Sequence, residues 1–266
     1  MIGFNNLGRM GRLANQMFQY ASLKGIAKNR GYEYMISYHA DAVNDGIGNM
    51  LRTELFDLFD LDVRTGIFNA PVVGERQHNF DQELFDNCPD NVVLQGYFQT
   101  EKYFKHIEDE IRKDFTFKNV ILEPCKEMME GVEAPVALHV RRTDYVTNAI
   151  NHPPCTLDYY KKALSHFEAH RNVIVFSDDP AWCNEQELFS GDNFMISENT
   201  DNRIDLCLMS LCSDFIIANS SFSWWGAWLS ANEDKKVIAP NQWFGKDGYT
   251  KDHDTSDMIP NGWTRI

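Results

Sequence analysis

The chain has 266 residues, with 39 acidic and 25 basic side chains, and a formal net charge of -14 at pH 7. This charge argues against a protein that gains its affinity by neutralising nucleic-acid phosphates or by lying on an anionic membrane. No apolar run approaches the ~20 residues of a membrane span, and the amino terminus lacks a signal-peptide pattern, so we expect a cytoplasmic protein without a transmembrane segment.

The first half begins with an apolar strand at residues 1–4, a glycine-containing turn and a helix from Leu13 that ends at Gly31. Many nucleotide-binding folds begin in this way, although the turn lacks the GxGxxG pattern. Asn15 lies in the first helical turn, where an ordinary capping role is the alternative to a functional one. Strands are then predicted at 32–36 and 92–98, a polar loop at 37–50, a short helix at 51–61 and another helix after residue 98.

The segment 117–135 mixes Pro124, Gly131 and Pro135 with charged residues, and we expect the domain boundary there. The predicted domains are residues 1–130 and 131–266. In the second, strands are predicted at 136–140, 173–176, 194–196, 215–218 and 237–239, with helices from Leu157, at Pro180 and at 202–211. This alternation predicts a doubly wound parallel sheet.

Polar side chains follow three of these strands. Arg141, Arg142 and Asp144 follow the first, Asp178 and Asp179 the second, and residues 219–223 the strand at 215–218. The carboxyl ends of parallel strands meet at one edge of a sheet, where α/β proteins bind ligands, and the guanidinium fork fits phosphate oxygens. The sequence therefore indicates an anionic ligand. The alternative is that both arginines form structural ion pairs with the chain's many carboxylates.

Each of the other candidates also has two interpretations. The serines at 220, 221 and 223 can hold a diphosphate at a helix amino terminus or act only as helix caps. Asp178 and Asp179 are adjacent and precede a proline, so a cap or a contact to a nucleoside hydroxyl is favoured over metal binding. Asp205 can contact a base or be solvated. The tryptophans at 224, 225 and 228 are expected in the core, with Phe222 the better candidate to touch a base.

The six cysteines show neither a CxxC pair nor a zinc-type spacing, and no metal site is expected. We expect mostly buried free thiols in a reducing compartment, with disulfides of a secreted protein as the alternative. The cysteines are Cys88, Cys125, Cys155, Cys183, Cys207 and Cys212.

Five segments, in this order, resemble the motifs of glycosyltransferase family 11, the α-1,2-fucosyltransferases. They are residues 11–21 (GRLANQMFQYA), 96–99 (GYFQ), 139–145 (HVRRTDY), 176–179 (FSDD) and 219–227 (NSSFSWWGA). The resemblance implies an α/β fold of the GT-B type, in which two Rossmann-like domains face a central cleft. It also implies a GDP-β-L-fucose donor, a galactoside acceptor bound by the first domain, and inversion at the anomeric carbon without a metal or other cofactor.

The resemblance also implies roles for single residues. Arg141 would contact the β-phosphate of the donor with Arg142 in support, and Asn15 would approach the sugar and phosphate. His139 and Asp205 would hold the guanine. Residues 220–223 (Ser220, Ser221, Phe222 and Ser223) would form the phosphate turn, and Asp178 belongs to the donor side of the site. One departure is Ala14, where the family usually has glycine.

The sequence leaves several alternatives open. The candidate bases for the acceptor hydroxyl are His39, Asp41 and Asp144, without a preference among them. The acceptor and its linkage are not determined, so a fucosyltransferase of another linkage or acceptor class is one alternative. A non-catalytic sugar- or nucleotide-binding protein is the other. Peripheral association with membrane-linked glycan synthesis stays open.

Overall fold

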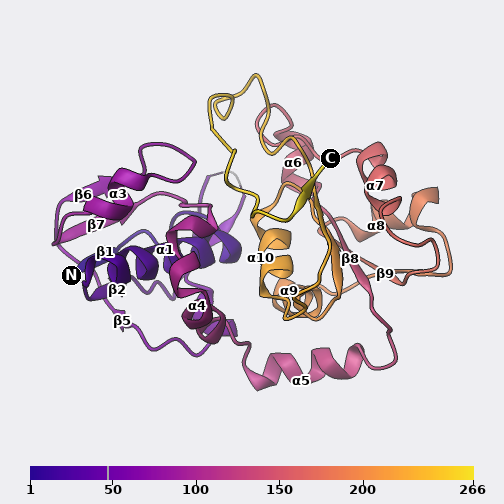
Figure 1. Ribbon diagram of the computed structural model, residues 1–266, viewed down its shortest axis with the longest axis horizontal. Coiled ribbons are helices and arrows are strands. Elements are labelled where there is room, and N and C mark those ends of the chain that lie inside the picture. Colours follow the sequence, from indigo (N-terminus) through magenta and orange to yellow (C-terminus); the bar gives the residue numbers. More distant parts are fainter. Residues whose placement is uncertain (47) are drawn as a thin grey trace. The chain divides into compact units, whose positions relative to one another are not determined.

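The computed structural model describes residues 1–46 and 48–266. The chain divides into two compact units, and Figure 1 colours it along the sequence. Unit 1 comprises residues 1–118 and 253–260, and unit 2 comprises residues 119–252 and 261–266. The two units are described separately.

The division lies between Lys118 and Asn119 and not at the expected position after residue 130. The segment between these two positions forms helix α5 (Asn119–Met128), which packs against helix α9 (Asn202–Ser210) of unit 2. Ile121 and Cys125, four residues apart, are the buried residues of α5, and the Cys125 thiol donates a hydrogen bond to the Ile204 carbonyl (3.8 Å). Charged residues and Pro124 made this stretch look like a linker, but its apolar face assigns it to unit 2.

The described part of unit 1 contains a five-stranded parallel sheet in the order β5-β2-β1-β7-β6. Its strands are β1 (Ile2–Phe4), β2 (Tyr34–Ile36), β5 (Arg64–Thr65), β6 (Val72–Gly74) and β7 (Val92–Gln95). Residues 37–50, which were expected to be a loop, contain β3 (Val43–Asn44), which pairs antiparallel with β4 (Met50–Leu51); Ile47 lies outside the described residues.

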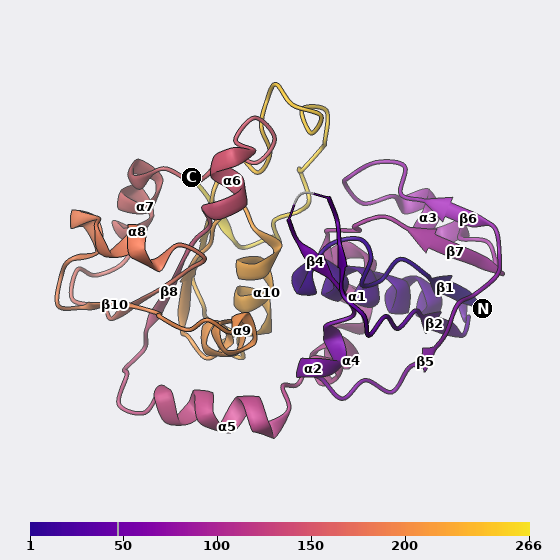
Figure 2. The same cartoon turned by 180° about the vertical axis from the view of Figure 1, so that it is seen from behind.

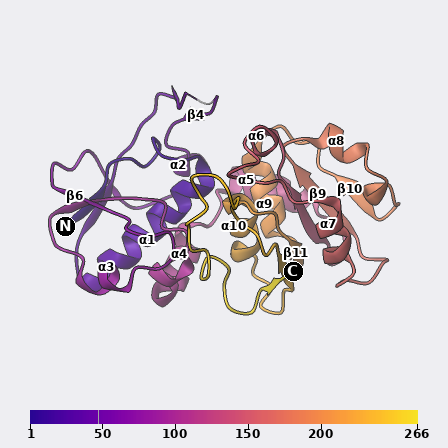
Figure 3. The same ribbon diagram turned by 90° about the horizontal axis from the view of Figure 1, so that it is seen from above.

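Helix α1 (Leu13–Arg30) is the main helix of unit 1 and is buried from Leu13 to Ala27 except at Asn15. It packs on β1 and β2, and Figure 3 shows it in this unit from above. The residue before it, Arg12, provides no side-chain cap; instead the Glu54 carboxylate accepts the Leu13 N–H (2.8 Å). The shorter helices are α2 (Leu55–Leu58), α3 (Gln82–Asn87), η1 (Glu101–Tyr103), η2 (Lys105–Ile107) and α4 (Glu108–Asp114).

The described part of unit 2 contains a six-stranded parallel sheet in the order β10-β9-β8-β11-β12-β13. Its strands are β8 (Val136–Val140), β9 (Val173–Ser177), β10 (Phe194–Ile196), β11 (Asp214–Ile216), β12 (Val237–Ala239) and β13 (Thr264–Arg265). The parallel α/β architecture predicted for this half is confirmed by these pairings.

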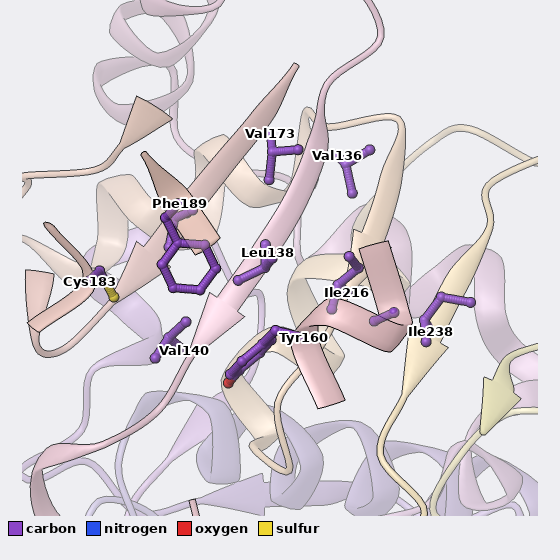
Figure 4. Packing of buried hydrophobic residues seen from close by; sticks show 11 residues of the cluster. Val136, Leu138, Val140, Tyr160, Val173, Cys183, Phe189, Ile216 and Ile238 are labelled. Carbon is purple, nitrogen blue, oxygen red and sulfur yellow. The ribbon is translucent and has the colours of Figure 1, made fainter. Parts of the chain in front are cut away.

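Helices cover both faces of this sheet (Figures 1 and 2). In addition to α5 and α9 they are α6 (Thr143–Thr147), α7 (Leu157–Leu164), α8 (Pro180–Asn184), η3 (Glu187–Phe189) and α10 (Ser221–Leu229). On one face, Val136, Leu138 and Val140 of β8 pack with Tyr160 of α7 and Cys183 of α8 (Figure 4). Side chains alternate along a strand, so His139 points to the other face, where its contact with α10 is described below.

All six cysteines are free thiols, as predicted, and only Cys155 is not fully buried. Burial raises the pKa of Cys88, Cys155 and Cys183 to about 11. Trp224, Trp225 and Trp228 are buried, which confirms their predicted place in the core. Among the described helices, none is both long enough and apolar enough to cross a membrane.

Candidate active site

The candidate site of unit 2 lies at the point in the sheet where the order of the strands reverses. From β8 the chain adds β9 and β10 on one side and then returns to place β11 on the other side of β8. The carboxyl ends of β8 and β11 therefore flank a topological switch point, where open α/β sheets bind ligands. Residues 141–144 follow β8, and residues 219–223 begin shortly after β11.

The Arg141 guanidinium is held between two carboxylates. Its Nη2 donates to Asp144 Oδ1 (2.5 Å), and its Nη1 lies 3.0 Å from Asp178 Oδ2. The Arg141 side chain is only 14% exposed, whereas that of Asp144 is 45% exposed. The guanidinium also lies over the Tyr145 ring (5.4 Å). The interpretation of Arg141 as a partner in ion pairs is therefore confirmed, and its role toward an anionic ligand stays a prediction.

Asp178 joins β9 to the segment after β8. It accepts hydrogen bonds from the Arg142 N–H (2.8 Å) and the Thr143 hydroxyl in addition to its ion pair with Arg141. Burial opposes ionisation of this carboxyl, but Arg141 and these donors outweigh it and hold the pKa of Asp178 below its usual range. Asp178 is therefore ionised at neutral pH and fixes the backbone from which both arginines project.

Arg142 packs flat against an aromatic ring. Its guanidinium carbon lies 3.9 Å from the centre of the Trp182 ring, and its Nε donates to Asp179 Oδ2 (3.1 Å). Asp179 also accepts the Trp182 N–H (3.2 Å) at the start of α8, so its favoured interpretation as a helix cap is confirmed. These contacts fix the Arg142 side chain in place.

His139 connects β8 to helix α10. Its Nδ1 lies 2.9 Å from the Ser223 Oγ, and its ring lies 5.7 Å from that of Phe222. The side chain is buried, and this burial lowers the pKa of His139 to about 4. The imidazole is therefore neutral at pH 7, with one donor and one acceptor nitrogen. Its Nε2 has no partner among the residues that the structure describes and is the ring atom open to a ligand.

The serine cluster begins helix α10. The Ser220 hydroxyl accepts the Phe222 N–H (3.3 Å) as the helix cap, and Ser221 is the first residue of the helix. Ser223 is fully buried beside His139. Asn219 holds neighbouring loops, because its amide nitrogen donates to the carbonyls of Pro153 (3.0 Å) and Trp243 (2.9 Å). The capping interpretation of Ser220 is therefore confirmed.

Asp205 lies on helix α9, which packs against α10. Its Oδ1 accepts hydrogen bonds from the Ser197 hydroxyl (2.7 Å) and the Asn199 amide (3.2 Å). Burial raises the pKa of Asp205 above its usual range. Among the described residues, it makes no hydrogen bond or ion pair with His139 or Arg141. The structure therefore does not bring Asp205 into direct contact with His139.

Asn15 belongs to unit 1 and lies at the switch point of that sheet. The carboxyl ends of β1 and β7 flank it: α1 follows β1, and residues 96–99 follow β7. The Asn15 Oδ1 accepts a hydrogen bond from Gln99 Nε2 (2.7 Å). Two motifs that are far apart in the sequence are thus joined by this contact.

The three candidate bases differ in their surroundings. The His39 Nε2 lies 3.3 Å from the Asn5 carbonyl, and Asp41 is exposed and offers its backbone carbonyl to Arg9 (3.0 Å). Asp144 is paired with Arg141. None of these contacts singles out one of the three as the base.

Several residues of the site were not singled out by the sequence analysis. Thr143 and Tyr145 lie within a motif that was quoted for its charges, and Trp182 follows the capping Asp179 by three residues. The Tyr145 hydroxyl donates to the Asn219 carbonyl (3.0 Å). The positions of these three residues in the sequence do not indicate a role in the site, because each acts through a partner on another element. Within residues 1–46 and 48–266, no group of three or more His, Cys, Asp or Glu side chains gathers as metal ligands do.

Parallel α/β units with arginine, carboxylate and serine side chains at a switch point define the class of proteins that bind nucleotides or nucleotide sugars. A model of glycosyl transferase family 11 matches residues 76–266, and the chain belongs to this family. The resemblance noted from the five motifs is confirmed.

Relatives with assigned names agree with this family. The chain is 33% identical to an α-1,2-colitosyltransferase of Escherichia coli over 96% of each chain. It is 26% identical to galactoside α-(1,2)-fucosyltransferase 2 of Bos taurus, over 87% of this chain and 70% of the relative. The chain is thus a fucosyltransferase-like enzyme of the α-1,2 type.

Solved structures are similar in fold. POFUT1 in complex with GDP-fucose matches with a TM-score of 0.57 at 13% identity, over 89% of this chain and 96% of that chain. The α-1,6-fucosyltransferase NodZ, soaked with GDP-fucose, matches with a TM-score of 0.51 at 14% identity, over 86% and 91%. At such identities the likeness concerns the fold alone.

Proposed function

We propose that the protein transfers L-fucose from GDP-β-L-fucose to the 2-hydroxyl of a terminal galactose, with inversion to an α-1,2 linkage. The observation that carries the proposal is the cluster of Arg141, Asp178, His139 and Ser223 at the switch point of unit 2, in a chain of family 11. The intact cluster argues against a non-catalytic sugar-binding protein.

On this proposal unit 2 binds the donor. The β-phosphate replaces the exposed Asp144 carboxylate at the Arg141 guanidinium, while buried Asp178 stays in place. Residues 220–223 offer backbone N–H groups at the amino terminus of α10, which attract phosphate oxygens. The neutral ring of His139 and the carboxylate of Asp205 hold the guanine. Arg142, fixed against Trp182, adds positive charge nearby.

The chemistry follows from the charges that develop. The bond between the fucosyl C1 and the β-phosphate oxygen breaks, and its electron pair leaves with GDP. The 2-hydroxyl of galactose attacks C1 from the opposite face and gives its proton to a base, for which His39, Asp41 and Asp144 are the candidates. Arg141 stabilises the growing negative charge on GDP, a role that a preorganised cation performs well in a site that excludes water.

In the proposed GT-B arrangement, unit 1 binds the acceptor and its Asn15 approaches the sugar and phosphate from the other side of a central cleft. The enzyme needs no metal, because Arg141 and Arg142 supply the positive charge. We propose that the reaction takes place in the cytoplasm, with galactoside acceptors of glycan biosynthesis.

A second candidate donor is favoured by one observation: a relative of near-complete mutual coverage is named an α-1,2-colitosyltransferase. Colitose is L-fucose without its 3-hydroxyl. The two sugars offer the same groups to a phosphate-binding arginine, so the unit 2 cluster accommodates either nucleotide sugar.

The test is to incubate the protein with GDP-fucose or GDP-colitose and a panel that includes lactose, other β-galactosides and glucosides. Proton NMR then locates the new linkage. We expect an α-1,2 product on galactosides, with a higher kcat/KM for GDP-fucose, and an unchanged rate in EDTA. Transfer to another hydroxyl would correct the proposed linkage, and a preference for GDP-colitose would correct the proposed donor. Binding of GDP-fucose without transfer to any acceptor would reject the proposed activity. Loss of activity in EDTA that Mn²⁺ restores would reject the metal-free mechanism.

A further inference from the structure

The turn after β7 has an unusual backbone. Phe98 has a φ of +53°, which residues with a side chain rarely adopt. Its ring is fully buried and packs edge-on against Phe4 (6.1 Å) and Tyr103 (5.4 Å). Such a conformation persists only where the surroundings hold it firmly.

One carboxylate holds this turn. Glu75, directly after β6, accepts the Tyr97 N–H at Oε2 (2.8 Å) and the Phe98 N–H at Oε1 (2.9 Å). The approach is so close that a Cβ on Gly96 would lie 2.4 Å from the Glu75 Cβ. Glycine at position 96 is therefore required for the carboxylate to reach both N–H groups.

The far end of the turn orients Asn15. Gln99 donates to the Asn15 Oδ1 (2.7 Å), and the Ser22 hydroxyl of α1 donates to the Phe98 carbonyl (3.2 Å). Accepting at Oδ1 fixes the direction of the Asn15 amide. A continuous path thus leads from the Glu75 carboxylate through two backbone N–H groups and Gln99 to Asn15.

We propose that Glu75 is a positioning residue that sets the orientation of Asn15 by holding residues 96–99 in this conformation. The consequence for catalysis rests on the function proposed above. Glu75 does not touch the substrate itself, and it precedes the first residue that the family model matches.

The charge of Glu75 matters for this role. Burial, with a smaller contribution from nearby Asp81, raises the pKa of Glu75 to about 7 against the opposing effect of the two N–H donors. The other charged or titratable groups around it are Arg76, which is paired with Asp81, and Tyr103, whose hydroxyl accepts the Asp81 N–H (2.9 Å). A protonated carboxyl turns one oxygen into a donor and loses one N–H contact. The turn is therefore held by two hydrogen bonds only above about pH 7.

The first test is Glu75→Gln, which keeps the shape and one acceptor. We expect kcat to fall about 10- to 100-fold with little change in KM for the donor. The reason is that Asn15, which would be misplaced in this variant, acts on the reaction rather than on binding of the donor. The wild-type enzyme should lose activity below about pH 7, and the variant should lack this pH dependence. Glu33→Gln is the matched control: Glu33 is exposed and its side chain has no partner among the described residues, so its kinetics should not change.

A double-mutant cycle tests the path. If Glu75 acts through Gln99, Glu75→Gln added to Gln99→Ala should lower kcat no further than Gln99→Ala alone. Additive losses of kcat would overturn the proposal, as would a Glu75→Gln enzyme with wild-type kcat and pH profile.

A measurement without substrates separates this proposal from the proposed function. In Glu75→Gln the Tyr97 and Phe98 amides should exchange with solvent faster, and the NMR signals of the Asn15 side-chain amide should shift. These changes would support the positioning role even if the wild-type protein transferred no fucose. Unchanged amide exchange and an unchanged Asn15 signal would refute the role even in an active fucosyltransferase.

Discussion

At the scale of the residue, Arg141 has two carboxylate partners before any ligand is bound. Of these two partners, Asp144 has a side chain that is far more exposed than that of Arg141. In unit 2, Arg171 offers the comparison: its Nη2 lies 2.7 Å from Asp214, whose side chain is only 14% exposed. Arg171 also lies near the exposed Glu168 (3.8 Å), so the exposure of a partner does not separate the two arginines; what distinguishes Arg141 is its place directly after β8, at the switch point of the sheet.

Arg141→Lys should lower kcat about 10²- to 10³-fold, because lysine keeps the charge but loses the planar fork that stabilises the leaving phosphate. Affinity for GDP-fucose should fall much less. Arg171→Lys should lower the melting temperature and leave kcat unchanged. Both quantities should be measured on the same preparations, and an Arg141→Lys enzyme that is less stable but fully active would show that the ion pairs are only structural.

Asp178→Asn should remove part of the pH dependence of the stability of unit 2. The pKa of Asp178 is lowered in the folded state, so its ionised form stabilises the fold above about pH 4, and this contribution is lost as the pH falls through the folded-state value. At pH 7 the free energy of unfolding of the variant should be about 2–3 kcal/mol lower than that of the wild-type protein. This difference should shrink toward pH 3. Urea unfolding at several pH values measures this. Asp192→Asn, at an exposed carboxylate without a partner among the described residues, should show no such trend.

The sequence predicted those residues whose role is local. The cap at Asp179 and the core position of Trp224 follow from neighbours one to four residues away. Glu75 and Trp182 were missed because each acts across elements, and no spacing marks such a partner. For the same reason the sequence could not show that Asp205 accepts hydrogen bonds from Ser197 and Asn199.

At the scale of the element, long apolar strands such as β8 and β9 were predicted almost to the residue. They are buried on both faces, so their composition alone identifies them. The two-residue strands β5 and β13 were not predicted, because pairing with β2 and β12 defines them rather than any local pattern. Helix α2 proved shorter than the predicted 51–61, since β4 takes up the first of these residues.

Helix α1 contains a glycine that its packing requires. A Cβ on Gly25 would lie 2.0 Å from the Tyr103 carbonyl oxygen, whereas a Cβ on Gly31 would meet nothing within 4 Å. We expect Gly25→Ala to destabilise unit 1 by about 3 kcal/mol through overpacking. Gly31→Ala should lower the free energy of unfolding by about 1 kcal/mol, because only the positive φ of this residue opposes the substitution. Chemical unfolding of both variants tests the ranking, and equal losses of stability would contradict this account of α1.

At the scale of the whole molecule, the proposed division of labour predicts where GDP protects the chain from hydrogen exchange. Protection should concentrate in unit 2, at residues 139–145 and 219–223, because the phosphate-binding groups lie there. Segments of unit 1 such as β2 and β5 should exchange as before. Protection confined to residues before 117 would show that the nucleotide binds elsewhere.

The chain's last residues belong to both units in turn: 253–260 to unit 1 and 261–266 to unit 2. Asp257 accepts the Phe80 N–H (2.9 Å) and the Thr100 hydroxyl (2.9 Å), and β13 is the edge strand of the sheet of unit 2. A ribosome makes residues 253–260 only after residues 119–252, so unit 1 lacks these contacts until most of unit 2 has been translated. Domains generally fold one after another during synthesis. Here unit 1 is completed only after most of unit 2 has been made, and a nascent chain stalled before residue 253 would leave unit 1 without these contacts.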